Sequence, residues 1–389
     1  MTPPSALRSS IPSPRRGRPT VVMISASIGA GHDGAACELT RRLTAAGFGV
    51  DRHDFLDMLP TGWGDAIRGS YAWQLRHAPA SWGWLLRAAA GPRASSGASA
   101  LAAGAATIRM LAAVGSGTAA VVSTYPLAGQ VLGRLRRTGR LAAPAIAFMT
   151  DPSVHPLCVA AGVDLHIAPG EPAAADIRTR YAAPAAVAGP VVDPAFRPSF
   201  GLSDAYDARY RLGLPLIDRL AVVVAGSWGV GDIESTARDI AATGSAMPVV
   251  VYGRNEVLRR RMARSGHVIT LGWVDDMASL LRAADVVVHN AGGLSSLEAM
   301  ASGVPVISYR CLPGHGAANA AVLCAAGLSP WPRRPAAFSA ALRQALDGDL
   351  RRRQQAAYAR LTAAADAAAL ITELARDRTA PPAPIGVPA

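Results

Sequence analysis

Short apolar segments recur along the whole chain, and stretches with apolar residues at helical spacing separate them. Near-continuous apolar strands that alternate with helices are typical of parallel sheets covered by helices on both faces. The pattern therefore predicts an α/β protein with two doubly wound domains that face one cleft. The expected strands are 20–25, 119–123, 145–148, 165–168 and 185–188 in the first half, and 220–224, 248–252, 268–271, 286–289 and 305–308 in the second.

The segments outside the two predicted sheets are expected to be a linker, helices and tails. Residues 191–215 contain several prolines and few apolar runs, which favours a linker between an N-terminal domain at 20–190 and a C-terminal domain at 216–334. Residues 335–378 are alanine-rich and predicted to be helical, and their last helix is a candidate to cross back onto the first domain. Residues 1–19, which are basic, and 379–389 are predicted tails. No segment matches a signal peptide or a membrane-spanning helix.

A glycine-rich turn follows the first strand of each predicted domain. Residues 27–32 read S-I-G-A-G-H, and residues 225–231 read A-G-S-W-G-V-G. Ligands of doubly wound sheets bind at the carboxyl ends of the strands, where these turns lie. We therefore expect the ligand site in the cleft, although G-x-G-H alone is a weak signal.

The most informative segment of the second half is 285–299, D-V-V-V-H-N-A-G-G-L-S-S-L-E-A. Here a strand ends, Gly292 and Gly293 let the backbone approach a ligand, and a helix begins with serines in its first turn. The free N–H groups and the positive end of such a helix would form a cradle for a diphosphate. Glu298 would then reach a ribose diol, while the spacing of Ser295 and Glu298 is also typical of a capping box.

Two further strand ends carry candidate residues, each with a purely structural alternative. Asp151 follows the strand at 145–148 and is positioned to be a general base, but it could equally cap the backbone before Pro152. Gly272–Val274 could offer backbone atoms to a nucleobase, or could simply begin a helix that Asp275 caps. His289 and His315 follow strand ends as loop candidates, where histidines are usually structural or exposed.

Composition is that of a globular protein, since 50% of the 389 residues are hydrophobic and 17% are charged. All 39 basic residues are arginines, because the sequence contains no lysine. This excludes a pyridoxal Schiff base, a lysine general base and the G-x-x-x-x-G-K-[ST] phosphate loop. The four cysteines have no C-x-x-C spacing, which argues against structural zinc and favours reduced thiols.

The net charge of +12 is concentrated in three segments, 1–20, 61–115 and 254–264. Local positive charge points to anionic surfaces or phosphates. The second segment also contains four of the seven tryptophans, and interleaved aromatic and arginine residues are typical of helices at a lipid interface. A buried core with a solvated basic face is the alternative, and a nucleic-acid groove is a minor one. The candidate membrane or acceptor residues are Trp63, Tyr71, Trp73, Trp82 and Trp84.

Taken in order, these motifs resemble those of GT-B glycosyltransferases that make glycosyldiacylglycerols, namely monogalactosyldiacylglycerol synthases and bacterial processive diacylglycerol glycosyltransferases. The transferase that adds N-acetylglucosamine to lipid-linked muropeptide is more distantly similar. The resemblance covers about residues 20–330. It rests on S-A-S-x-G-x-G-H at 25–32, T-D-x-x-x-H at 150–155, G-P-V at 189–191, G-x-x-G at 226–229, G-R-N at 253–255, G-x-V-x-x-M at 272–277, G-G at 292–293 with E-A at 298–299, and P-G at 313–314 with Asn319.

The resemblance implies a GT-B fold and transfer of a hexose from a UDP-sugar to a membrane lipid acceptor, with inversion and without a metal or cofactor. It implies Asp151 or His32 as the base for the acceptor proton. It also implies an acceptor or phosphate loop that includes Gly29, Gly31 and His155. The implied donor-binding residues are Gly226, Ser227, Gly229, Arg254, Asn255, Gly272, Trp273, Val274, Gly292, Gly293, Leu294, Ser295, Glu298, His315 and Asn319.

The chain departs from the family pattern at two places. Ala291 stands where the family usually has proline, and His315-Gly316 stand where it usually has Gln-Glu. Relatives use that Gln and Glu to contact the sugar, so the identity of the donor sugar stays open. Expected partners are a UDP-sugar, a lipid acceptor and an anionic membrane surface, without nucleic acid, at the inner face of the plasma membrane. A polyprenyl-linked or small-molecule acceptor, or a non-catalytic membrane-binding protein, remains an alternative.

Overall fold

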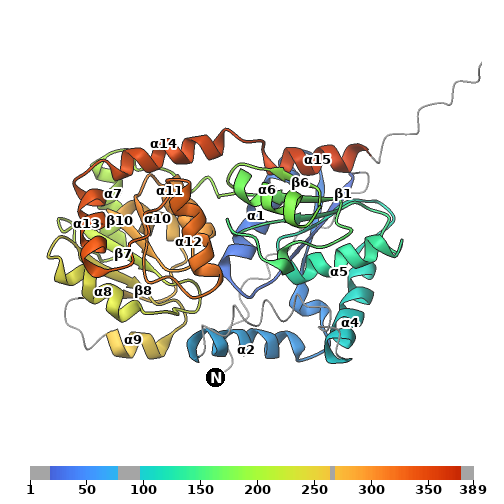
Figure 1. The fold of residues 1–389 in the computed structure, drawn as a ribbon, viewed down its shortest axis with the longest axis horizontal. Helices are drawn as coiled ribbons and strands as arrows, with labels where there is room; N and C mark the ends of the chain where they lie inside the picture. Colours follow the sequence, from blue (N-terminus) through green and yellow to red (C-terminus); the bar gives the residue numbers. More distant parts are fainter. Residues whose placement is uncertain (1–17, 78–96, 263–267, 378–389) are drawn as a thin grey trace, which may run out of the picture.

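The computed structural model describes residues 18–77, 97–262 and 268–377. It contains two α/β domains placed side by side (Figure 1). The predicted tail at 379–389, nearly all of the predicted tail at 1–19, and Trp82 and Trp84 lie outside the described residues.

The N-terminal domain is built on a six-stranded parallel sheet with the order β2-β1-β3-β4-β5-β6. Its described helices lie in the connections between these strands. The strands are β1 Thr20–Ser25, β2 Gly49–Asp54, β3 Thr118–Ser123, β4 Ala145–Phe148, β5 Leu165–Ala168 and β6 Ala185–Val187. The helices are α1 Ala30–Ala45, η1 Phe55–Met58, α2 Trp63–His77, α4 Gly97–Ala113, α5 Pro126–Arg137, η2 Pro156–Cys158 and α6 Glu171–Arg180.

The C-terminal domain repeats the plan with a five-stranded parallel sheet of order β11-β10-β7-β8-β9. The strands are β7 Leu220–Val224, β8 Met247–Val251, β9 Ile269–Leu271, β10 Val286–His289 and β11 Val306–Ser308. The helices are α7 Leu202–Arg211, α8 Ile233–Ala242, α9 Glu256–Met262, α10 Met277–Ala283, α11 Leu294–Ala301, α12 His315–Ala325, α13 Pro335–Leu346 and α14 Leu350–Thr362. The predicted fold class, two doubly wound α/β domains, is confirmed.

Each sheet is buried on both faces, as near-continuous apolar strands require. In the first domain, one core layer contains Val22 and Ile24 of β1, and the layer on the opposite face contains Val21 and Met23 of the same strand. The central strand β7 of the second domain is buried along its whole length. Fully covered sheets leave only the loops at the strand ends free to form a site.

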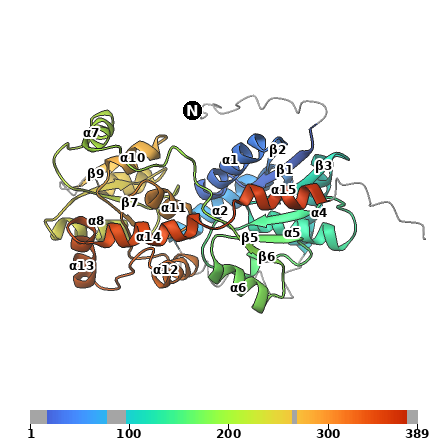
Figure 2. The same cartoon turned by 90° about the horizontal axis from the view of Figure 1, so that it is seen from above.

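The last helix connects the two domains. The helices α13 and α14 pack on the C-terminal domain, and α15 (Ala367–Asp377) then lies against α1 and β3 of the N-terminal domain (Figures 1 and 2). Ile371 and Ala375 of α15 are fully buried in the N-terminal core. The chain therefore crosses between the domains twice among its described residues.

One part of the predicted linker is structured. Residues 202–211 form α7, which packs against α10, and Ala208 and Leu214 belong to the core of the C-terminal domain. The helix is short, and most of its side chains are exposed, so its apolar periodicity is weak in the sequence. The prolines around it mark loops on either side rather than one continuous linker.

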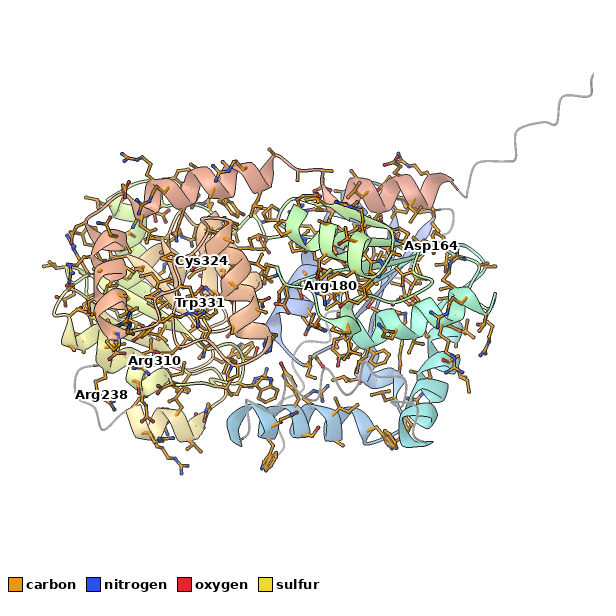
Figure 3. All side chains as sticks on the ribbon, viewed as in Figure 1. Asp164, Arg180, Arg238, Arg310, Cys324 and Trp331 are labelled. Carbon is orange, nitrogen blue, oxygen red and sulfur yellow. The ribbon has the colours of Figure 1, made fainter. Side chains whose placement is uncertain are left out.

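The remaining sequence expectations concern cysteines and membrane spans. All four cysteines are free, in agreement with reduced thiols, and Cys324 lies on α12 (Figure 3). Within the described residues, no helix combines the length and apolarity needed to span a membrane.

Candidate active site in the interdomain cleft

The ligand site of a doubly wound sheet is expected where the direction of winding reverses. In the N-terminal sheet this point lies between β1 and β3, which pair with each other, and in the C-terminal sheet it lies between β7 and β10. The loops after β1, β7 and β10 carry glycine-rich segments, whereas the loop after β3 contains no glycine. The segment after β1 reaches the cleft from one side, and the segments after β7 and β10 reach it from the other.

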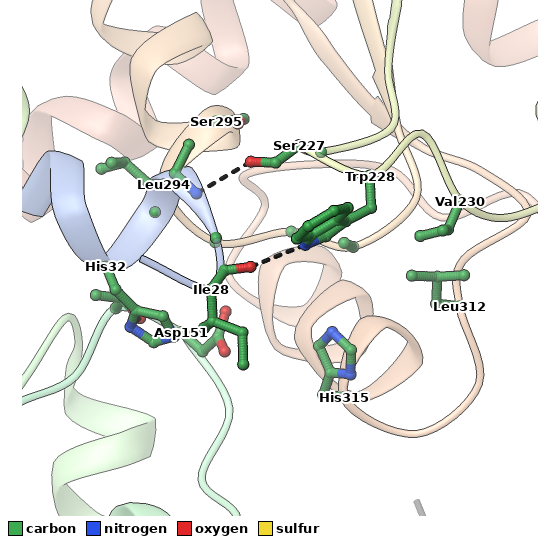
Figure 4. A pocket seen from close by; sticks show the side chains of 18 of the residues that line it. Ile28, His32, Asp151, Ser227, Trp228, Val230, Leu294, Ser295, Leu312 and His315 are labelled. Atoms are coloured by element: carbon green, nitrogen blue, oxygen red, sulfur yellow. Dashed lines mark hydrogen bonds between the residues drawn. The ribbon is translucent and has the colours of Figure 1, made fainter. Parts of the chain in front are cut away.

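A cavity of about 190 Å³ lies between these loops. It is lined by three groups of residues from the N-terminal domain and three from the C-terminal domain (Figure 4). The lining residues are Ile28–His32, Tyr71, Thr150 and Asp151 on one side, and Ala225–Trp228, Val230, Ala291–Ser295, Leu312 and His315 on the other.

Two hydrogen bonds join the glycine-rich loops across the cleft (Figure 4). The Ala30 N–H donates to Ser227 Oγ at 3.1 Å, and Trp228 Nε1–H donates to the Ile28 carbonyl at 2.8 Å. Ala30 begins α1, whose N-cap residue Gly29 supplies no side-chain cap. Ser227 thus satisfies a free N–H of a helix in the other domain.

The glycines after β1 also allow the close approach of the domains. Gly29, Gly31 and Gly34 have the full G-x-G-x-x-G spacing. A Cβ at Gly34 would lie 2.7 Å from Leu294 Cδ2 of the other domain, and one at Gly31 would lie 3.7 Å from Leu294 Cβ. The absence of a side chain at Gly34 therefore lets α1 pack against the start of α11.

The predicted diphosphate cradle has the required backbone shape. Gly292 and Gly293 have φ values of +76° and +78°, in the left-handed region that favours glycine. A Cβ at Gly293 would also lie 2.9 Å from Asp151 Oδ1. Gly293 is the N-cap of α11 and provides no side-chain cap, while Ser295 lies within the first turn. The capping-box alternative for Ser295 is therefore wrong, and Leu294 and Ser295 at the start of α11 line the cavity.

His289 holds the cradle loop through a hydrogen bond. It is buried, and its Nδ1 accepts a hydrogen bond from the Gly292 N–H at 2.9 Å. Its Nε2 lies within hydrogen-bond distance of Ser296 Oγ and Ser308 Oγ. Burial lowers the pKa of His289 to about 4, so the ring is neutral and Nδ1 is free to accept. His289, the last residue of β10, is thus structural.

His32 is held in one tautomer by its surroundings. Its Nδ1 lies 2.7 Å from the carbonyl oxygen of Thr124, which can only accept, so Nδ1 carries the proton. The lone pair of the neutral ring therefore resides on Nε2. Burial lowers the pKa of His32, against a raising effect of the Asp151 charge. Tyr125 packs edge-on against the ring, with centroids 5.5 Å apart, and fixes its plane.

Asp151 reaches the same cavity from the loop after β4. Its Oδ1 accepts a hydrogen bond at 3.0 Å from Asn319 Nδ2, a side chain of the other domain. The structure therefore brings together Asp151, His32 and the cradle at Gly292–Ser295. A negative carboxylate beside a neutral imidazole with a free Nε2 is able to take a proton from a hydroxyl group.

Two other histidines lie near Asp151. His315 lines the cavity at the start of α12, and its buried Nδ1 has no hydrogen-bond partner. His155 lies outside the cavity lining, with Nε2 at 3.0 Å from Cys158 Sγ. Burial lowers the pKa of His155, which the nearby His315 lowers further and Asp151 raises. His155 therefore does not line the cavity.

Glu298 lies on α11, outside the cavity lining, and burial raises its pKa to about 7. The negative charge of Asp193 adds to this effect. A mostly buried carboxylate with a strongly raised pKa is typical of a functional position.

The predicted base-binding segment lies farther out along the C-terminal domain. Trp273 is 47% exposed, and the Arg254 guanidinium lies 4.5 Å from the centre of its ring. Asn255 Nδ2 donates to the Gly229 carbonyl at 2.8 Å and so anchors the glycine-rich loop to α9. Gly272–Val274 precede α10, whose N-cap is Asp276 rather than Asp275.

The aromatic residues of α2 divide between two environments. Tyr71 is partly buried and lines the cavity, whereas Trp63 and Trp73 are 36% and 61% exposed. The membrane prediction therefore concerns the latter two among the described residues.

Asp347 and Asp349 have the D-x-D spacing that can hold a metal ion. They are the C-cap of α13 and the N-cap of α14, and they form ion pairs with Arg219 and Arg353. Among the described residues, no group of three histidine, cysteine or acidic side chains is arranged to bind a metal.

Eight residues that line the cavity were not among the predicted site residues, namely Ile28, Ala30, Thr150, Ala225, Trp228, Val230, Ala291 and Leu312. All except Leu312 belong to segments that the motifs had already marked. Trp228 was recognisable only as a large aromatic residue inside a glycine-rich turn. Its partner in the other domain could not be found from spacing.

Comparisons with known proteins agree with this geometry. The family model described as "Glycosyl transferases group 1" matches residues 232–348. The processive diacylglycerol beta-glucosyltransferase of Bacillus subtilis is 27% identical over 208 residues, which cover 51% of this chain and 53% of that protein. The chain thus spans about half the length of the curated relatives that it matches.

Solved structures extend the comparison to nearly the whole chain. Medicago truncatula UGT71G1, complexed with UDP-glucose, superposes with a TM-score of 0.60 at 13% identity, covering 93% of this chain and 99% of that one. WaaG, a glycosyltransferase involved in lipopolysaccharide biosynthesis, superposes with a TM-score of 0.54 at 14% identity, covering 93% and 100%. The chain has the GT-B fold. The resemblance to GT-B glycosyltransferases that act on diacylglycerol is likewise confirmed.

Proposed function

We propose that this GT-B protein transfers a hexose from a UDP-sugar to a diacylglycerol-type membrane lipid, with inversion at the anomeric carbon. One observation carries the proposal. Asp151 and His32, whose Nε2 is unprotonated, line one cavity together with Gly292–Ser295 at the start of α11. A base and an anion cradle in one cavity are what a displacement at a nucleotide sugar requires.

The proposed step breaks one bond and forms another at the anomeric carbon. The acceptor hydroxyl oxygen attacks that carbon while its proton passes to His32 Nε2, with the Asp151 carboxylate stabilising the charge on the ring. The bond from the anomeric carbon to the diphosphate oxygen breaks, and its electron pair leaves with UDP. The backbone N–H groups of Gly292–Ser295 and the Gly226–Gly229 loop stabilise that negative charge.

The remaining donor contacts follow from the resemblance and the positions of the residues. Glu298 would accept hydrogen bonds from the ribose diol, and Gly272–Val274 would bind uracil. His315, whose buried Nδ1 has no partner, would bind the transferred sugar. Arg254 would hold Trp273 through their contact rather than bind phosphate itself.

The lipid acceptor is supported by the names of the curated relatives and by one surface of the N-terminal domain. A groove of about 910 Å³ lies among Trp63, Ile108, Arg134 and Arg140, and the helix α2, which begins at Trp63, also carries the exposed Trp73. Ile108 is 68% exposed. Apolar and arginine side chains on one face suit peripheral binding to an anionic membrane, which we place at its cytoplasmic side.

The test is a screen of UDP-sugars against diacylglycerol in anionic vesicles, with polyprenyl phosphate and soluble alcohols as other acceptors and with product masses measured. A hexosyl lipid formed only in the presence of vesicles is the expected result. Transfer to a soluble acceptor without vesicles would replace the lipid assignment. Full activity in both Asp151→Asn and His32→Ala would refute the assigned base.

A further inference from the structure

Asn319 of α12 was expected to bind the donor, but its side-chain amide already has four partners. It is fully buried. Nδ2 donates to Asp151 Oδ1 and to the Ala291 carbonyl, both at 3.0 Å. Oδ1 accepts from the Ser153 N–H at 3.1 Å and from Ser153 Oγ. A primary amide has two donors and two acceptor sites, so its capacity is used completely.

The chemistry of the partners leaves one orientation for this amide. The Asp151 carboxylate and the Ala291 carbonyl can only accept, so the amide nitrogen faces them, while the Ser153 N–H can only donate to the amide oxygen. Two of the partner residues, Asp151 and Ser153, belong to the N-terminal domain. The third belongs to the loop that carries the cradle glycines.

The cradle loop also packs closely on the Asn319 side chain. A Cβ at Gly292 would lie 2.8 Å from the Asn319 Cβ, so the cradle loop passes directly over this side chain. A Cβ at the next residue, Gly293, would approach Asp151 Oδ1. Asn319 therefore contacts the cradle loop and the carboxylate together.

We infer that Asn319, a residue of the C-terminal domain, is a positioning residue that orients the Asp151 carboxylate of the N-terminal domain. The pair of Asp151 and His32 is then able to take the acceptor proton only when the two domains are closed. The inference rests on the proposed function for its catalytic part. With Oδ1 held by Asn319, Oδ2 is the oxygen left to act on the His32 ring or the acceptor. A shift of about 1 Å in a catalytic group can lower turnover by about 10²-fold.

The kinetic test compares Asn319→Ala with the matched control Ser153→Ala, which leaves the contact between Asn319 and Asp151 in place. We expect kcat of Asn319→Ala to fall by about 10²-fold and its affinity for UDP, measured by calorimetry, to change by less than about threefold. Ser153→Ala should lose less than about fivefold in kcat. UDP affinity that falls in parallel with kcat would overturn the positioning role and make Asn319 a donor ligand.

Two cycles complete the test. In the Asp151→Asn background, Asn319→Ala should cause no further loss of kcat, because residues that act as one unit are not additive. Equal losses in both backgrounds would refute the inference. Independently of catalysis, the Tm losses of Asp151→Ala and Asn319→Ala should be less than additive in the double variant. Additive losses would show that the contact is absent, whereas inactivity of the wild type against every acceptor would refute the proposed function instead.

Discussion

Replacing Glu298 by glutamine is expected to stabilise the protein while weakening its affinity for UDP. The pKa of Glu298 rises from its ordinary 4.5 to about 7, first because the carboxyl is buried and second because Asp193 is nearby. One pH unit corresponds to about 1.4 kcal/mol, so the ionised carboxylate costs up to about 3 kcal/mol in the folded state.

The pH dependence of this cost has a definite sign. Between pH 4.5 and about 7 the folded state binds more protons at Glu298 than the unfolded state does. Stability therefore falls as the pH rises through this range, and the full cost is present above it. Glutamine has no charge, so its burial does not carry the cost of an ionised carboxylate. The free energy of unfolding of Glu298→Gln should exceed that of the wild type by up to about 3 kcal/mol at about pH 8, and by less than about 1 kcal/mol at about pH 5.

The assay is urea unfolding at these two pH values, with UDP titration calorimetry on the same samples. The exposed Glu373→Gln on α15 is the control, for which we expect unchanged stability and binding. Loss of the charged hydrogen bonds to ribose should weaken UDP affinity by about 10- to 100-fold in Glu298→Gln. Equal stability of wild type and variant at both pH values would refute the burial argument, and unchanged UDP affinity would refute the ribose contact.

Three further predictions concern the base, the cradle and the membrane. Because burial lowers the pKa of His32, kcat/KM should stay on its plateau as the pH falls through 6.5 and decline only below it, as a pH–rate profile would record. Gly293→Ala would force a Cβ against Asp151 at positive φ, so we expect transfer to fall by about 10²-fold in a rate assay. Trp73→Ala should reduce sedimentation with anionic vesicles, whereas Tyr210→Ala, an exposed aromatic on the other domain, should not.

The strands were largely predictable because burial on both faces produces apolar runs. The bounds of β1, β4, β5, β7 and β10 agree with the sequence predictions. The strand β2 (V-D-R-H-D after Gly49) was not among them, because it lies at the edge of its sheet and every residue in it is partly exposed. Its residues therefore lack both the apolar run and a clear alternation of buried and exposed positions.

The candidate site was predictable to the extent that it follows strand ends. Motifs after β1, β4, β7 and β10 converge because carboxyl ends of parallel strands meet at one edge of a sheet. Local pattern cannot show which residues meet across the two domains. Asn319 contacts Asp151 across 168 positions, and Trp228 contacts Ile28 across 200, so neither contact leaves a signal in spacing.

The most direct test of the account is the mass and the anomeric configuration of the product made from UDP-hexose and diacylglycerol vesicles. The wild type should form a lipid that carries hexose with the configuration opposite to that of the donor, and the double variant Asp151→Asn, His32→Ala should form none. Retention of configuration would contradict the single displacement, and equal product from the double variant would contradict the cavity as the site of the reaction.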